Sequence, residues 1–204
     1  MNRKSSAIAI ATALTLVFSA VSVGSAQESA GEPEMSPEAQ AEMAAWMKLA
    51  QPGEHHQHLQ AYAGKWKTQI KMWMAPGAEP MLSESTAEAE WIMDGRFLKW
   101  QQKGEFAGSP YTGLGYDGYN NADGRYESIY MDNFGTLMVL YTGECSDDGK
   151  TRVIQGSFTN PMEGATIEQR NVYSWIDDDH FKMESFMKMG DEEYKQMEML
   201  YERQ

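Results

Sequence analysis

The sequence predicts an all-β fold: one closed, antiparallel, up-and-down barrel of about ten strands, preceded by one or two short helices. From Gly64 onward, apolar and polar side chains alternate with a period of two, as in strands that bury one face. Turn signals separate the segments, and no helical segment long enough for a crossover lies between them, which excludes parallel connections. So many sequential strands would leave exposed edges unless the sheet closed. A barrel is therefore favoured, and a two-sheet sandwich is the alternative.

Residues 1–26 have the pattern of a secretory signal peptide. Arg3 and Lys4 precede an uncharged, mostly apolar run over 7–23, and small residues at 24–26 suit a signal peptidase. The apolar run is marginal for a membrane-spanning helix, which needs about 20 apolar residues. Cleavage after Ala26 is therefore favoured over a retained anchor. We expect a periplasmic or secreted protein with no membrane attachment after signal cleavage.

The composition indicates an acidic domain held together by packing. The net charge is −13, and loss of the signal would remove two cations and no acids. Such a field disfavours nucleic acids and anionic membrane surfaces as partners. Cys145 is the single cysteine and cannot form an internal disulfide. No cofactor is identified, and the oligomeric state is not predicted.

We expect a disordered linker over 27–36, followed by one domain over 37–204 that contains the helices and the barrel. Ser36-Pro37 is a good helix start, with Ser at the N-cap and Pro at the first helical position. One apolar stripe follows on that helix, at Met43, Trp46, Met47 and Ala50. Pro52-Gly53 ends it, and a second short helix is predicted over 54–63.

The first strand begins after Gly64 and places Trp66, Thr68, Ile70, Met72 and Met74 on one face. The next segment alternates from Ala87 to Met93, and Asp94-Gly95 predicts a hairpin before Leu98 and Trp100 share a face. Further strands are expected over 111–119, 125–132, 136–142, 151–158, 166–176, 181–189 and 193–203.

Gly64-Lys65-Trp66 resembles the G-x-W mark of lipocalin-type barrels. In those proteins the Trp closes the barrel floor and an Arg from a late strand lies over it. In this sequence Arg203 shares a face with Met197, Met199 and Tyr201, the inward residues of the last strand. The resemblance implies a cation–π contact of Arg203 with Trp66, and its role would be structural.

A wider set of motifs covers residues 46–203. It comprises Pro52-Gly53-Glu54, His56-x-x-Leu59, Gly64-x-Trp66, Met72-Trp73-Met74, Pro76-Gly77-Ala78-Glu79-Pro80, Gly95-Arg96-Phe97-Leu98, Gly115-Tyr116-Asp117, Tyr126-x-Ser128, Asp132-Asn133-Phe134-Gly135-Thr136, Asp147-Asp148-Gly149-Lys150 and Tyr201-Glu202-Arg203. Together these resemble a bacterial family catalogued as domain of unknown function 1579. The resemblance implies a lipocalin-like barrel, and it implies neither an activity nor catalytic residues. Asp94-Gly95 departs from the Gly-Gly expected in that family.

The favoured function is binding of a small apolar or amphipathic ligand inside the barrel. The inward residues expected to wall the cavity are Trp91, Trp100, Tyr130, Met72 and Met197. Arg96 shares the face of Leu98 and Trp100, so it is a candidate to hold a ligand carboxylate. Alternatively, Arg96 locks the barrel rim against an acid such as Asp94 or Asp132, and this structural role is favoured.

Two other functions stay open. An enzyme would use Arg96 and His56 as polar groups in the cavity. The sequence contains no recognisable catalytic motif, so no catalytic residue is predicted. His56 is assigned instead to a hydrogen bond that fixes the helix across the barrel end. A metal-binding protein would use His55 and His58, three residues apart on a helix, although no further ligand cluster follows and packing is favoured. The methionines are interpreted as core residues rather than copper ligands. Gln169, Asn171, Tyr173 and Trp175 share one face and are candidates for a polar cavity wall; alternatively, the strand is flipped and its other face, with Val172 and Ile176, points inward.

Overall fold

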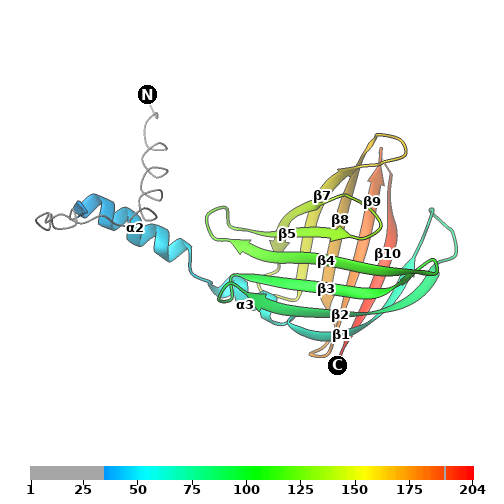
Figure 1. The fold of residues 1–204 in the computed structure, drawn as a ribbon, viewed down its shortest axis with the longest axis horizontal. Helices are drawn as coiled ribbons and strands as arrows, with labels where there is room; N and C mark the ends of the chain where they lie inside the picture. Colours follow the sequence, from blue (N-terminus) through cyan, green and yellow to red (C-terminus); the bar gives the residue numbers. More distant parts are fainter. Residues whose placement is uncertain (1–34, 191) are drawn as a thin grey trace, which may run out of the picture. The chain divides into compact units, whose positions relative to one another are not determined.

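The computed structural model describes residues 35–190 and 192–204. Ten strands form one closed barrel in chain order, and every neighbouring pair is antiparallel (Figure 1). The predicted barrel is confirmed, and the sandwich alternative is wrong. The strands are β1 (Gly64–Met72), β2 (Met81–Ile92), β3 (Phe97–Phe106), β4 (Ser109–Asn120), β5 (Arg125–Asp132), β6 (Val139–Cys145), β7 (Thr151–Thr159), β8 (Thr166–Trp175), β9 (His180–Met189) and β10 (Glu192–Arg203).

The barrel closes where β1 pairs with β10, in a register that runs from Trp66 opposite Arg203 to Met72 opposite Met197. The alternation predicted for β1 is the reason that this register works. Trp66 and Thr68 are buried, whereas the neighbouring Lys65 and Lys67 are exposed. Because the side-chain period of a strand is two, a slip by one residue would turn lysines into the core.

Strand bounds differ from the prediction at several segment ends. Residues 136–138 were expected to begin a strand, yet β6 begins at Val139. The reason is pairing: β5 ends at Asp132, and its register with β6 begins with Tyr130 opposite Val139, which leaves residues 133–138 as a loop. β1 ends at Met72, so Met74 lies in the following loop, and β2 begins at Met81, earlier than the predicted segment.

Two helices precede the barrel: α2 (Pro37–Leu49) and α3 (Glu54–Gln60). The predicted stripe of α2 is present but not buried among the described residues, since Trp46 is 65 % exposed. Side chains of the barrel donate hydrogen bonds to backbone carbonyls just after α2. Asn121 Nδ2 donates to Gln51 O at 2.8 Å, and Arg96 Nε donates to Ala50 O at 3.0 Å. Neither helix of the described residues has the length and apolar composition that a bilayer-crossing helix needs.

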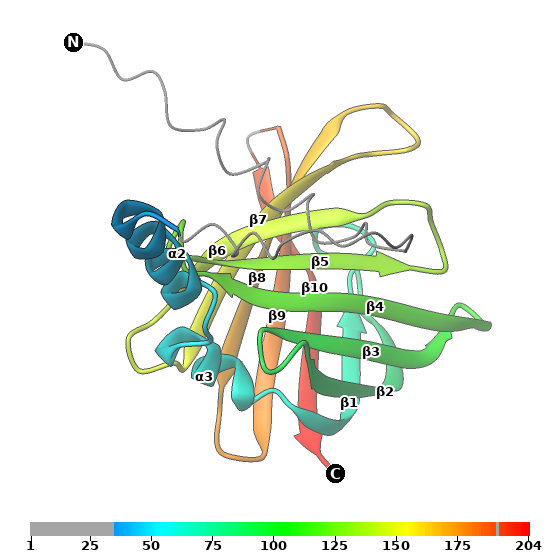
Figure 2. The same cartoon turned by 60° about the vertical axis from the view of Figure 1, so that its left-hand side comes forward.

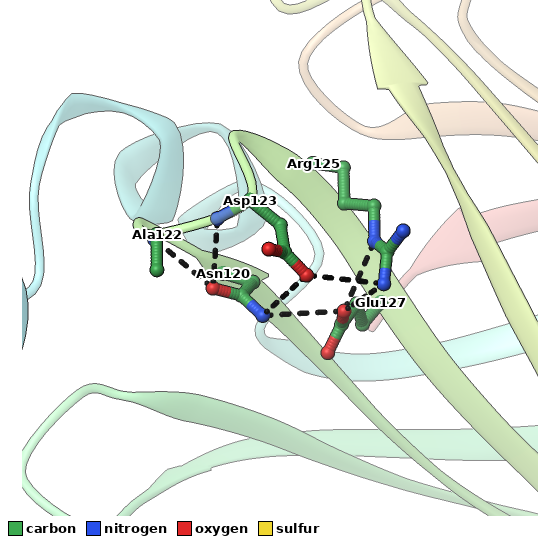
Figure 3. A network of polar contacts seen from close by, with 5 residues as sticks. All are labelled: Asn120, Ala122, Asp123, Arg125 and Glu127. Atoms are coloured by element: carbon green, nitrogen blue, oxygen red, sulfur yellow. Dashed lines mark hydrogen bonds and ion pairs between the residues drawn. The ribbon is translucent and has the colours of Figure 1, made fainter. Parts of the chain in front are cut away.

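A polar network fixes the turn between β4 and β5 (Figure 3). Asn120 Oδ1 accepts from two backbone N–H groups of the turn at 3.0 and 3.1 Å, and Asn120 Nδ2 donates to Asp123 and Glu127 at 3.3 Å. Arg125 pairs with the same two carboxylates. Exposed pairs of this kind contribute little stability each, about 0–1 kcal/mol. Their effect is local order in the turn from which Asn121 reaches the end of α2.

Candidate ligand-binding cavity

The barrel encloses a cavity of about 640 Å³. This volume lies within the roughly 300–1,000 Å³ that small-molecule sites occupy. Its lining runs from Tyr62 and Trp66 at one end to Phe134, Leu137 and Pro161 in the loops at the other. The direction of the strands explains the arrangement. β1 begins near Tyr62, and because β5 and β7 run in the same direction as β1, the loops after them lie at the opposite end of the barrel.

An aromatic core closes the end of the barrel next to α3. The helix α3 lies beside β4, with which it is in contact (Figure 2). The core contains Leu59, Tyr62, Trp66, Leu98, Tyr126 and Phe181. Trp66 Nε1 donates to Tyr62 O at 2.9 Å, which ties the strand to the turn after α3. The Arg203 guanidinium lies 4.2 Å from the centre of the Trp66 ring. Arg203 also donates to the carbonyls of Ala63 and Ala61, at 3.0 and 2.8 Å. This is the structural contact that the sequence analysis expected.

A charged pair lies at the cavity floor, beside this core. Arg152 Nη1 is 3.1 Å from Asp117 Oδ1, and their side chains are only 2 % and 7 % exposed. Ser128 Oγ donates to the same Asp117 oxygen. The rings of Tyr62 and Tyr173 flank the guanidinium, with centroids 5.0 and 4.4 Å from its carbon. All five residues line the cavity.

Several polar atoms at the floor have no hydrogen-bond partner among the described residues. They are Arg152 Nε and Nη1, Tyr62 Oη and Asn171 Oδ1. Arg152 Nη1 is close enough to Asp117 for an ion pair, but its N–H bonds are not aligned for a hydrogen bond. Buried polar groups in proteins are almost always paired, because an unpaired one costs about 1–3 kcal/mol. The floor therefore keeps unused hydrogen-bonding capacity.

The electrostatics of the floor fix which groups donate. Burial acts to lower the pKa of Arg152, but the nearby Asp117 carboxylate outweighs it and raises the pKa. Burial raises the pKa of Tyr62 to about 12, against the opposing effect of Arg152. Burial also raises the pKa of Tyr173. At neutral pH the guanidinium is therefore charged and both phenols carry their protons.

The walls above the floor pair their polar groups with one another. Gln102 Nε2 donates to Ser85 Oγ at 2.6 Å, and on the other side of the barrel Gln169 Nε2 donates to Ser185 Oγ at 2.8 Å. Tyr141 donates to Gln169. Of the predicted polar wall, Gln169, Asn171 and Tyr173 line the cavity, whereas Trp175 does not. The apolar part of the lining includes five methionines, which are flexible and adapt to irregular shapes: Met72, Met183, Met187, Met197 and Met199.

Four of the six residues predicted to bind a ligand line the cavity: Trp100, Tyr130, Met72 and Met197. Trp100 and Tyr130 stack with ring centroids 6.0 Å apart. Tyr130 donates to Asp132, and its oxygen lies 3.1 Å from Tyr111 Oη. Tyr130 packs against a second buried cluster of Val139, Tyr141 and Ile154, whereas Trp100 packs against the core at the closed end.

Arg96 and Trp91 do not line the cavity, so the prediction that they face its interior is wrong. Arg96 donates to the carbonyls of Ala50 and Met93 and lies 3.9 Å from Asp94 Oδ2, which is the structural lock that the sequence analysis favoured. The alternation fails here because residues 93–95 all have positive φ and bend the chain. The indole of Trp91 donates to Gln60, and its ring packs beside the closed-end core.

The histidines of α3 also lie outside the cavity lining. His56 is buried, and its Nδ1 accepts the Gly53 N–H at 3.0 Å, so it fixes the start of the helix. Burial, followed by the charges of His55 and Arg96, lowers the pKa of His56. An enzymatic site that pairs Arg96 with His56 inside the cavity is therefore excluded. Instead of facing a shared ion, His55 stacks on Tyr119 with centroids 4.1 Å apart, and His58 Nδ1 lies 2.9 Å from Tyr126 Oη. No group of three metal-ligating side chains occurs in the described part of the chain.

Arg152 and Asp117 were missed as site residues, although a signal for them exists in the sequence. Arg152 and the buried Ile154 are two residues apart on β7 and share its inward face. Asp117 lies on the same face as Gly115 in β4. An inward arginine in a barrel requires a partner, and an inward aspartate is the natural one.

Comparisons with known proteins agree with the fold. A family model described as "Protein of unknown function (DUF1579)" matches residues 51–203. Among solved structures, Rv2717c from M. tuberculosis is similar with a TM-score of 0.56 and 17 % identity, over 76 % of this chain and 99 % of that chain. A redesigned β-barrel has a TM-score of 0.41 and 12 % identity, over 72 % and 95 % of the two chains. No curated protein matches the chain. At this identity the likeness to Rv2717c concerns the fold alone.

Proposed function

The chain belongs to the DUF1579 family of proteins of unknown function, and on this premise we propose that its barrel binds a small apolar or amphipathic molecule in the central cavity. One observation carries the proposal: a cavity of about 640 Å³ inside the barrel whose lining is mainly aromatic, aliphatic and methionine side chains. Sites for small molecules are typically concave and mostly apolar, with a few polar groups that set orientation.

The position of the polar groups supports an amphipathic ligand in particular. Wall residues such as Gln102 and Gln169 bond to serines within the wall and have little capacity left. Four of the five buried side-chain atoms that lack a hydrogen-bond partner among the described residues lie at the floor instead, on Arg152, Tyr62 and Asn171; the fifth, Trp175 Nε1, does not line the cavity. A ligand with its polar end at the floor and its apolar body toward the loops would satisfy these atoms and cover apolar surface.

A pair of variants on one strand tests this proposal. Ser83 on β2 lines the cavity, whereas its neighbour Leu82 points outward and is 74 % exposed. Ser83→Trp would fill part of the cavity, and Leu82→Trp would add the same side chain outside. The probe is N-phenyl-1-naphthylamine, an uncharged apolar fluorophore, titrated into each purified protein.

We expect saturable binding to the parent and to Leu82→Trp, and at least tenfold weaker binding to Ser83→Trp. Equal binding to all three proteins would move the probe out of the barrel and contradict the proposal. Native mass spectrometry of protein from its own host would add the natural ligand as a mass adduct.

We also infer export of the protein. The support is the signal-like pattern of residues 1–26, which lie outside the described residues. Cell fractionation with intact-mass measurement tests the inference. The expected product begins at Gln27 and lies in the periplasm or the medium, whereas a full-length product in the cytoplasm would contradict it.

A further inference from the structure

The charge at the cavity floor is already balanced within the protein. Arg152 is the one cation among the described residues that line the cavity, and Asp117 lies 3.1 Å from it. The lining holds two further carboxylates, on Glu105 and Asp132. An anionic head group at the floor would therefore meet a guanidinium that is already paired, together with a neighbouring carboxylate in a site of low dielectric constant.

The free capacity at the floor is of both kinds, donor and acceptor. Among the described residues, Arg152 Nε and Tyr62 Oη are donors without a hydrogen-bond partner, Arg152 Nη1 faces Asp117 without an aligned hydrogen bond, and Asn171 Oδ1 is an acceptor without a partner. Strand register brings them together: Arg152 on β7 lies opposite Tyr173 on β8, and Asn171 is two residues before Tyr173 on the same inward face. Cα atoms in such diagonal positions lie about 7–8 Å apart. The donors and the acceptor therefore belong to neighbouring positions of the same inward face.

We propose that the cavity selects uncharged amphiphiles, in which an apolar chain ends in a hydroxyl or a primary amide, over the corresponding carboxylates. A hydroxyl or amide both accepts and donates, so it uses the free capacity without adding charge. An ammonium head group is also disfavoured, because the positive charge of Arg152 would repel it. The inference rests on the proposed function and names the chemistry of the ligand's polar end.

Competition against bound N-phenyl-1-naphthylamine tests the selectivity with three probes of equal chain length: decan-1-ol, decanamide and decanoate. In the parent we expect the alcohol and the amide to displace the fluorophore at concentrations at least tenfold lower than decanoate. Displacement by decanoate at equal or lower concentration would overturn the inference and leave the proposed function standing. Failure of the fluorophore itself to bind in the cavity would overturn the proposed function, and the inference with it.

Asp117→Asn removes the balancing charge and nearly preserves the shape of the side chain. It should strengthen decanoate binding at least tenfold and change decan-1-ol binding less than threefold, because Arg152 is then free to pair with the ligand. Asp147→Asn is the matched control: it removes an exposed carboxylate from the turn before β7, outside the residues that line the cavity, and should change the binding of both probes less than threefold. Absence of any gain for decanoate in folded Asp117→Asn would contradict the role of the pair.

A second variant keeps the test decisive if Asp117→Asn does not fold. Arg152→Gln combined with Asp117→Asn removes both charges and retains polar side chains. It should keep at least a tenfold preference for the alcohol over decanoate. The floor of the folded double variant also carries no net charge, so loss or reversal of that preference would contradict the inference that a charge-balanced floor favours the uncharged head group.

Discussion

The Arg152–Asp117 pair makes a sharp prediction about stability. With side chains 2 % and 7 % exposed, the pair is fully buried, so the values for surface salt bridges do not apply. Removal of one partner from a buried pair leaves an uncompensated charge, which costs about 3–5 kcal/mol. We expect that loss for Arg152→Met. Asp117→Leu also deprives Ser128 of its acceptor and should cost about 1 kcal/mol more.

The double variant is the informative protein. With both charges replaced by apolar side chains of similar size, the desolvation penalty disappears together with the attraction, and such replacements are often neutral or stabilising. Only the unpaired Ser128 hydroxyl remains as a cost, so we expect Arg152→Met/Asp117→Leu to lie within about 1–2 kcal/mol of the parent. Urea unfolding followed by tryptophan fluorescence gives the free energy of unfolding of all four proteins. A double variant that loses as much as the two single variants together would refute the reasoning, because the residues would then act independently.

Three further predictions concern the closed end and the strands. Because burial lowers the pKa of His56, its folded state binds fewer protons than the unfolded state below about pH 6.5. The stability that neutral His56 contributes is therefore present above that pH and lost as pH falls. In urea unfolding, the difference in the free energy of unfolding between the parent and His56→Gln should shrink from pH 7.5 to pH 5. A difference that stays constant would contradict this. Arg203→Ala should cost about 2–4 kcal/mol in the same assay, because it removes the contact with Trp66 and two hydrogen bonds to carbonyls. Arg203→Lys should recover less than half of this loss, because lysine lacks the planar guanidinium. Full recovery by lysine would argue against stacking on Trp66. Gly143→Ala should cost at least about 3 kcal/mol in thermal unfolding, since its Cβ would overlap a carbonyl of β7, whereas Gly135→Ala, with its nearest atom at 3.8 Å, should stay within about 1 kcal/mol; similar losses at the two glycines would contradict the packing argument.

Much of the fold follows from the two-residue alternation, because a strand has only two faces and one of them is buried. That rule sets Trp66 and Thr68 inward and also places Trp100 and Tyr130 in the cavity lining. It fails at Arg96, where three residues with positive φ bend the chain and end the alternation.

The floor of the cavity could not be assembled from the sequence for a different reason. Alternation tells which face a residue occupies, but not which residue lies across the barrel. Asp117 on β4 and Arg152 on β7 are separated by two intervening strands, so no hairpin register relates them. Likewise, the stripe on α2 is a correct helical pattern, yet pattern alone does not provide a surface that covers it.

The order of strands also has a consequence for how the chain folds. Nine of the ten strand pairings join neighbours in sequence, whereas the tenth brings Arg203 to Ala63, 140 residues away. Short hairpin loops cost little entropy to close and a long one costs more, so the seam between β1 and β10 is expected to zip last. Contacts formed after the transition state act mainly on the unfolding rate. Weakening the seam should therefore shorten the lifetime of the native state in kinetic experiments while leaving the refolding rate nearly constant.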